Sequence, residues 1–225
     1  DMPMPRTSLL VVLNEVVRRN RIAEGMVYLQ ISRGVAPRDH VFPANTRPSV
    51  VITAKSVDRE AAAKKAAIGI KAMSAPDIRW GRCDIKTVGL LPNVLAKQKA
   101  KGVGAGEVIF VDAEGYVTEG GSTNVYMVGA DGIIKTRSLE ANILPGVTRL
   151  NLLPLIRENG MDIREEAFTL EEAKGAAEVF ITAATSLVMP IIAIDDHEIG
   201  GGKPGLIACA LREIYIQHAR LTAGV

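Results

Sequence analysis

Lys86 is a lysine whose surroundings could make it a nucleophile. It lies at a predicted strand-to-helix junction, after a run of basic and acidic residues and before a lysine-rich helical pattern, and the apolar residues Val88 and Leu90 follow it closely. An ammonium group beside apolar walls has a lowered pKa, because burial disfavours its charged form. Such a lysine can attack a carbonyl carbon and form a Schiff base. Taken alone, the pattern favours a simpler interpretation, an ordinary solvated lysine near Asp84.

A loop rich in basic residues could bind a carboxylate. Residues 33–43 contain Arg33, Arg38 and His40, together with two prolines that would stiffen the loop. A guanidinium group binds a carboxylate through two parallel hydrogen bonds. The simpler alternative is a solvated loop with incidental charges, which is a common arrangement.

An acidic residue at a predicted strand end could hold a protonated ring nitrogen. Glu119 is followed by Gly120 and Gly121 and then by small hydroxyl residues. Glycines without a Cβ atom would allow a flat ligand to come close to the backbone. The simpler alternative is a hairpin turn with an exposed glutamate.

Two further segments could bind an anion. Residues 142–149 run through a Pro-Gly pair into a predicted helix, so the N–H groups of Val147 and Thr148 would form a cradle with the threonine hydroxyl. Residues 182–186 are small and hydroxylic and follow an apolar strand, where backbone amides could reach a phosphate. Their simpler alternatives are a plain turn and a strand end. A lysine, a ring-nitrogen acid, a phosphate cradle and a carboxylate clamp are together the parts of a pyridoxal phosphate site.

Helices and strands in mixed order must position these residues. Periodicity predicts helices over residues 7–20, 88–101, 147–159, 169–174 and 204–219, and strands over 26–33, 48–54, 67–73, 107–112, 116–119, 124–128, 133–136, 178–182 and 190–194. Residues 1–75 then form a helix on a small sheet. The absence of regular βαβ alternation predicts an α+β fold class with a barrel-like second half.

Local signals mark the ends of three of these helices. Thr7 and Ser8 are expected to cap the first helix. Thr169 opens a capping box with the glutamate three residues later. Pro154 is expected to kink its helix or to shift the start of that helix.

Composition limits the class of protein. The 225 residues are 48% hydrophobic and 23% charged with a formal net charge of +2, as in soluble globular proteins. We expect no nucleic-acid partner, because no basic stripe is visible, and no membrane span, because no apolar run is long enough. Two cysteines without a disulfide framework favour a cytoplasmic setting, and three histidines outside metal-binding intervals argue against a zinc enzyme.

Three blocks of the sequence resemble the fold-type IV pyridoxal phosphate-dependent aminotransferases. They are residues 77–86, 118–124 and 143–149, and their order and spacing match over nearly the whole chain. Residues 32–43 look like the loop of the D-amino acid aminotransferases in particular. Branched-chain aminotransferases and aminodeoxychorismate lyases share the lysine and glutamate blocks but not typically the Arg-x-His loop.

The resemblance also implies a domain organisation. A small α/β domain would cover residues 1–62, and a larger cofactor-binding pseudo-barrel α+β domain would cover residues 63–225. Residues 1–6 form a short Pro/Met leader. The part that normally precedes Thr7 in the family is missing here, together with a tyrosine and a phosphate-binding arginine. We therefore expect a small domain that lacks its N-terminal part.

The matching positions carry the family's cofactor roles by resemblance. Lys86 would be the catalytic residue and the Schiff-base lysine, and Glu119 would be the partner of the pyridine nitrogen. Val147 and Thr148 would bind the phosphate of pyridoxal 5'-phosphate. Leu144 would pack on the ring.

The same resemblance implies roles for two further pairs of residues. The family often has a hydroxyl residue where Ala184 stands, so Thr185 and the backbone would have to bind the phosphate there. Arg38 and His40 would bind the substrate α-carboxylate and reach across from the second subunit of a homodimer.

The implied reaction is transamination between a D-amino acid, such as D-alanine, and a 2-oxo acid, such as 2-oxoglutarate. Two alternatives keep the cofactor but change the substrate: an L-branched-chain amino acid aminotransferase and an aminodeoxychorismate lyase. A third alternative is a truncated chain that folds but binds no cofactor.

Overall fold

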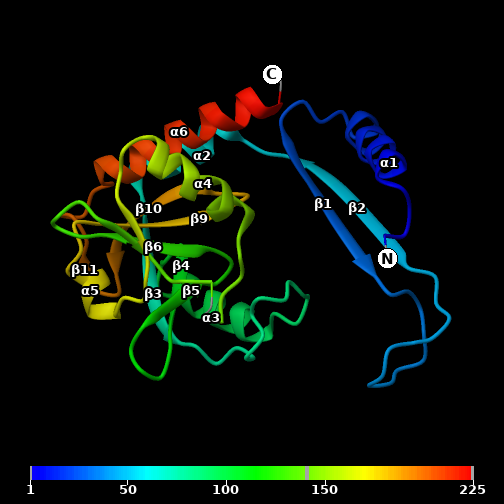
Figure 1. Cartoon of the computed structure of the whole chain (residues 1–225), viewed down its shortest axis with the longest axis horizontal. Coiled ribbons are helices and arrows are strands. Elements are labelled where there is room, and N and C mark those ends of the chain that lie inside the picture. The colour runs from blue at the N-terminus through cyan, green and yellow to red at the C-terminus, as the bar shows by residue number, and fades with distance from the viewer. Residues whose placement is uncertain (1, 140–141, 224–225) are drawn as a thin grey trace. The chain divides into compact units, whose positions relative to one another are not determined.

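The computed structural model describes residues 2–139 and 142–223, so Asp1 of the leader lies outside the described residues (Figure 1). The chain divides into two units, Asp1–Ala61 and Ala62–Val225. Each unit is described by itself. Within the described ranges, none of the helices is both long and apolar enough to cross a membrane.

The first unit is built from one helix and a β-hairpin. Helix α1 spans Arg6–Arg19, and strands β1 (Gly25–Ser32) and β2 (Ser49–Ser56) pair antiparallel in the predicted places. The predicted cap of α1 is wrong. Pro5 occupies the N-cap position without a side-chain hydrogen bond, and Thr7 already lies inside the first turn.

The connection to the second unit contains a helix that periodicity did not predict. Helix α2 spans Arg59–Ile68, a run of alanine, lysine and glutamate that favours helix, and strand β3 (Ile70–Pro76) follows Gly69. Gly69 adopts a φ of +80°, which an L side chain rarely tolerates. The predicted strand over residues 67–73 therefore begins too early. Strand β3 also pairs with strands of the second unit, so the prediction that residues 1–75 form one helix-on-sheet unit is wrong.

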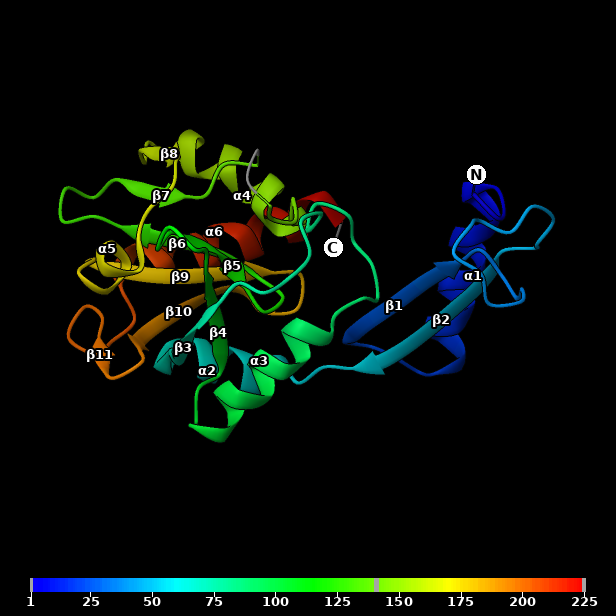
Figure 2. The same ribbon diagram turned by 90° about the horizontal axis from the view of Figure 1, so that it is seen from below.

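The second unit is organised around a sheet of nine strands among the described residues. The spatial order is β5-β4-β3-β10-β9-β6-β7-β8, and β11 pairs with β10 (Figure 2). The further strands are β4 (Glu107–Val111), β5 (Val117–Gly120), β6 (Asn124–Val128), β7 (Ile134–Thr136), β8 (Ile163–Glu165), β9 (Glu178–Ala183), β10 (Leu187–Ile194) and β11 (His197–Glu198). The helices are α3 (Leu91–Gly102), α4 (Val147–Glu158), α5 (Leu170–Lys174) and α6 (Leu206–Ala223).

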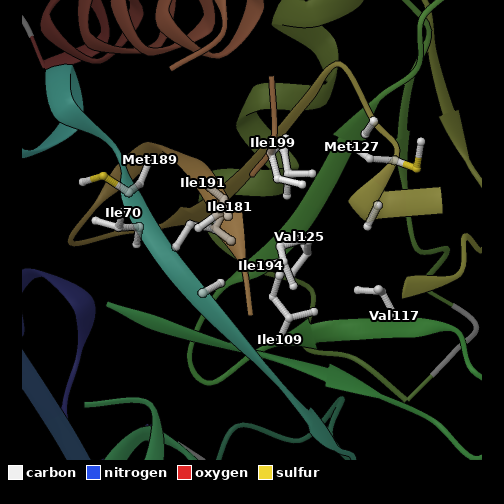
Figure 3. Packing of buried hydrophobic residues seen from close by; sticks show 14 of the residues in the cluster. Ile70, Ile109, Val117, Val125, Met127, Ile181, Met189, Ile191, Ile194 and Ile199 are labelled. Atoms are coloured by element: carbon white, nitrogen blue, oxygen red, sulfur yellow. The ribbon is translucent and has the colours of Figure 1, made fainter. Parts of the chain in front are cut away.

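The sheet curls because strands distant in its order are joined by a short turn. β5 lies at one edge and β6 lies in the interior of the order, yet only residues 121–123 connect them. The Gly120 N–H donates to the Thr123 carbonyl at 2.7 Å and closes this turn. The curl encloses an apolar core formed by side chains such as Ile109, Val125 and Ile181 (Figure 3). This arrangement is the predicted half-barrel.

Helices cover the outer face of the sheet. A second apolar cluster joins α4 and α6 to β6, β9 and β10, and Figure 1 shows both helices lying over these strands. A third, smaller cluster joins α3 to β4 through Ala96, Ala100, Val108 and Phe110 (Figure 2). The predicted start of α4 is confirmed, and Pro154 lies inside that helix without shifting its start. Periodicity missed β8 and β11 because strands of three and two residues carry little pattern.

The capping box at α5 gives a first testable prediction. The Thr169 hydroxyl accepts from the Glu172 N–H at 3.1 Å, and the Glu172 carboxylate accepts from the Thr169 N–H at 2.7 Å. Loss of an N-cap side chain costs about 1 kcal/mol. We therefore expect Thr169→Ala to lower the melting temperature, measured by circular dichroism, by about 2–4 °C.

Thr7→Ala is the matched control, because Thr7 is exposed and α1 has no side-chain cap. It should leave the melting temperature unchanged. An equal loss in both variants would contradict a capping role for Thr169.

Candidate active site

One cavity of about 750 Å³ in the second unit brings together most of the predicted cofactor residues. It is bounded by the loop between β3 and α3, the turn between β5 and β6, the segment that enters α4, and the end of β9. The predicted residues that line it are Lys86, Glu119, Leu144, Val147, Thr148 and Ala184. Its volume suits a small organic cofactor.

Lys86 lies on the loop between β3 and α3, as its position between a strand and a helix predicts. Its side chain is exposed at the cavity. The predicted burial of this ammonium group among apolar walls is wrong. The reason is that its apolar neighbours Ile85, Val88 and Leu90 are themselves 43%, 73% and 49% exposed.

Glu119 is a buried carboxylate held by three donors. It lies on β5 and is only 6% exposed. Its Oε1 atom accepts a hydrogen bond from Arg79 Nη1. Its Oε2 atom accepts from the Leu144 N–H at 3.1 Å and from Asn124 Nδ2 at 3.4 Å. Leu144 therefore touches the site through its backbone.

Arg79 connects Glu119 to a second carboxylate. Its side chain is 5% exposed and donates to both oxygens of Asp77, from Nε at 2.9 Å and from Nη2 at 2.7 Å. The Thr118 hydroxyl donates to Asp77 Oδ2 at 2.7 Å. The guanidinium carbon lies 4.7 Å from the centre of the Phe110 ring. This network holds the Glu119 carboxylate in one orientation.

The same network sets the charge of both acids. Burial raises the pKa of Glu119, and the charge and hydrogen bond of Arg79 counteract that rise. Burial also acts to raise the pKa of Asp77, but the hydrogen bonds from Arg79 and Thr118 prevail and lower it. Arg79 therefore favours the ionised form of Glu119, which is the form that accepts an N–H bond.

The N-terminus of α4 forms the opposite side of the cavity. Gly146 is its N-cap residue and has no side chain that could cap the N–H groups of the first turn. A Cβ atom on Gly146 would collide with Asn124 Oδ1, which explains the glycine. Thr148 is 1% exposed, and its Oγ1 atom has no hydrogen-bond partner in the part of the chain that the structure describes. These donors suit an anion.

The remaining predicted residues lie elsewhere. Thr185 is exposed and is not among the described residues that line the cavity. Arg38 and His40 are exposed on the loop between β1 and β2 in the first unit. In that loop, Arg33 stacks on Phe42 with its guanidinium carbon 3.7 Å from the ring centre.

Periodicity and motif reasoning missed the contributions of Arg79, Asp77, Asn124 and Thr182 to this cavity. Asp77, Arg79 and Asn124 stand inside the blocks that carry the resemblance, and Thr182 opens the small hydroxylic segment 182–186, but none of these side chains was given a role. The Arg79–Glu119 contact spans 40 positions of sequence. The one local signal available was that Asp77 and Arg79 stand two positions apart, so their side chains would lie on the same side of an extended segment.

The curled sheet and the cavity with its lysine, buried glutamate and anion cradle define a class of enzyme. The chain belongs to the class IV amino-transferase family, whose model matches residues 1–194. It is 42% identical over 205 residues to the D-alanine aminotransferase of Bacillus licheniformis, a match that covers 91% of this chain and 71% of that protein. It is 41% identical over 219 residues to the D-alanine aminotransferase of Staphylococcus haemolyticus, covering 97% of this chain and 76% of the relative.

A solved structure shows the same fold. The T.th. branched-chain amino acid aminotransferase with pyridoxamine 5'-phosphate has a TM-score of 0.85 and 28% sequence identity to this chain. The likeness covers 96% of this chain and 72% of that chain. The predicted α+β fold of the fold-type IV aminotransferases is thereby confirmed.

Proposed function

We propose that this protein transfers the amino group of a D-amino acid, such as D-alanine, to a 2-oxo acid, such as 2-oxoglutarate, with pyridoxal 5'-phosphate as cofactor. One observation carries the proposal: a single cavity presents an exposed amine at Lys86, a buried carboxylate at Glu119 and a buried Thr148 hydroxyl that has no partner among the described residues. The relatives named D-alanine aminotransferase support the choice of substrate.

The residues present fit the cofactor. The buried Thr148 hydroxyl without a partner and the N–H groups at the start of α4 match a phosphate, and Glu119 matches a pyridine nitrogen. Lys86 Nζ would attach the cofactor covalently. When bound, the cofactor supplies an electron sink for the bonds at the substrate α-carbon.

The side chains then have separate tasks. Lys86 Nζ takes the proton from the substrate α-carbon and returns it, which its exposure within the cavity allows. Glu119, whose ionised form Arg79 favours, would accept the N–H of the ring nitrogen and so keep that nitrogen protonated. Leu144 would pack on the ring, from the segment that also donates to Glu119.

Substrate recognition is assigned to the loop of the first unit. We propose that Arg38 and His40 bind the substrate α-carboxylate, supported by their hydrogen-bond donors and their resemblance to the D-amino acid aminotransferase loop. They would act on the cavity of the partner in a homodimer. We also propose that the first unit is the small domain and the second the cofactor-binding domain. A cytoplasmic setting is supported by the free cysteines Cys83 and Cys209.

The assay compares two amino donors with the same acceptor. Purified protein is incubated with pyridoxal phosphate, 2-oxoglutarate and either D-alanine or L-leucine, and the 2-oxo acid product is measured. We expect D-alanine to react at least about tenfold faster, because a carboxylate clamp of fixed orientation distinguishes the two faces of the α-carbon.

Each alternative predicts a different result of this assay. Faster reaction of L-leucine would indicate a branched-chain aminotransferase, the activity named for the structurally similar protein. In a parallel incubation with aminodeoxychorismate as the substrate, turnover there and with neither amino donor would indicate the lyase. A protein that stays colourless with added cofactor and converts neither donor would contradict the proposed function.

A further inference from the structure

We propose that Thr182 supplies the second hydroxyl of the phosphate site, in the role that the sequence predicts for Thr185. The inference rests on the proposed function. Thr182 stands at the end of β9 and lines the cavity, and nothing in the sequence motifs assigns its side chain a role.

The register of β6 and β9 places Thr182 on the cavity side of the sheet. Asn124 and Thr182 are directly opposite each other in this antiparallel pair. Residues directly opposite project their side chains from the same face. Asn124 Nδ2 reaches the Leu144 carbonyl at 2.9 Å and Glu119 at 3.4 Å, so this face is the cavity floor.

The Thr182 hydroxyl is buried but has no partner. The residue is 2% exposed, and its Oγ1 atom makes no hydrogen bond to any described residue. A buried hydroxyl left unbonded is destabilising, because it has lost its hydrogen bonds to water, so such groups in native proteins are usually satisfied. Its position in the wall of the cavity makes a bound ligand the natural acceptor.

Two buried hydroxyls in one cavity select the kind of ligand. Thr148 and Thr182 both line the cavity, both are at least 98% buried and both have an unpartnered Oγ1 atom. The free N–H groups at the start of α4 adjoin Thr148. All of these groups can donate, so the ligand must offer several acceptor oxygens, as a phosphate monoester does.

Tyr126 is a neighbour of Thr182 on the same face of the sheet. Its ring stacks on Phe180 with centroids 4.7 Å apart, two positions from Thr182 on the same face of β9. Burial raises the pKa of Tyr126, and the nearby Thr182 hydroxyl counteracts that rise. Tyr126 therefore keeps its proton at neutral pH.

The test separates phosphate binding from ring binding. Pyridoxal phosphate and pyridoxal, which lacks the phosphate, are titrated into the cofactor-free full chain, and binding is followed by Trp80 fluorescence. We expect Thr182→Val to lower the affinity for pyridoxal phosphate by about 10-fold to 100-fold, because one hydrogen bond to a charged group is lost. Pyridoxal affinity should not change. Thr185→Val is the matched control and should change neither affinity.

The outcomes are distinguishable. The inference would be overturned if Thr182→Val lowered the affinities for pyridoxal phosphate and pyridoxal equally. It would also be overturned if Thr185→Val, instead of Thr182→Val, lowered the affinity for pyridoxal phosphate alone. If the valine variant does not fold, Thr182→Ser and Thr182→Ala take its place, and only the alanine variant should lose phosphate affinity. Unaltered binding by the alanine variant would also overturn it. A wild-type chain that binds neither ligand would overturn the proposed function itself and the inference with it.

Discussion

Replacement of Lys86 by alanine is expected to abolish covalent attachment of the cofactor and to lower kcat by at least about 10²–10⁴-fold, the contribution of a positioned acid–base group. Among the described residues that line the cavity, Lys86 is the one lysine, so no neighbouring amine can replace it. Attachment is measured as the yellow absorbance and as borohydride-trapped cofactor found by mass spectrometry.

Lys99→Ala is the matched control for Lys86→Ala. Lys99 is an exposed lysine in the last turn of α3 and does not line the cavity. The control should keep both the absorbance and the turnover. A Lys86→Ala protein that still carries trapped cofactor would show that another amine is the attachment site.

Arg79→Leu is expected to cause the largest loss of stability, because it leaves Asp77 and Glu119 buried without their cation. Both carboxylates lie against the guanidinium, whose side chain is 5% exposed. Breaking a buried ion pair from one side costs about 3–5 kcal/mol. We expect the free energy of unfolding, measured by urea titration, to fall by that amount, and the affinity for pyridoxal phosphate to fall with it.

The loss in Arg79→Leu should depend on pH. Without Arg79, the burial of Glu119 raises its folded-state pKa further, so the folded state binds a proton more readily than the unfolded state. Stability then decreases as pH rises through that raised pKa. The difference from the wild type should therefore be larger at about pH 8 than at about pH 5.

Arg82→Leu is a closely matched control for Arg79→Leu. Arg82 pairs with Asp84 at 2.8 Å, also two positions along the same loop, but both side chains are solvent-exposed, 61% and 44%. Exposed pairs contribute little to stability. This variant should unfold like the wild type. A loss as large as that of Arg79→Leu would show that burial is not the cause.

Several elements of the fold and of the site can be predicted from the sequence because their signals are local. The start of α4 follows from a Pro-Gly pair before helical spacing, and the capping box of α5 follows from two side chains three positions apart. Glu119 is visible at the end of a strand before two glycines. In each case the residues that determine the structure are neighbours in the chain.

Other elements depend on contacts between distant segments. The true start and sheet of β3 were missed because a short apolar run suits either a helix or a strand, and pairing with β4 and β10 decides the outcome. Helix α2 was missed because its alanine- and lysine-rich sequence has few large apolar residues to mark a buried face. The exposure of Lys86 also could not be predicted from its apolar neighbours in the sequence. Whether their side chains point toward Lys86 depends on the path of the loop and not on their order in the sequence.

By itself the sequence determined which residues are proposed to carry the chemistry: Lys86, Glu119 and the segment that enters α4 stand in short motifs whose types and order suit one cofactor. Only the tertiary structure decided how Lys86 and Glu119 are held. Lys86 is exposed in a cavity, and Glu119 is clamped by Arg79, which Asp77 holds in turn. The reason is that charge and burial are properties of the space around a side chain, which the curled sheet assembles from segments far apart in sequence.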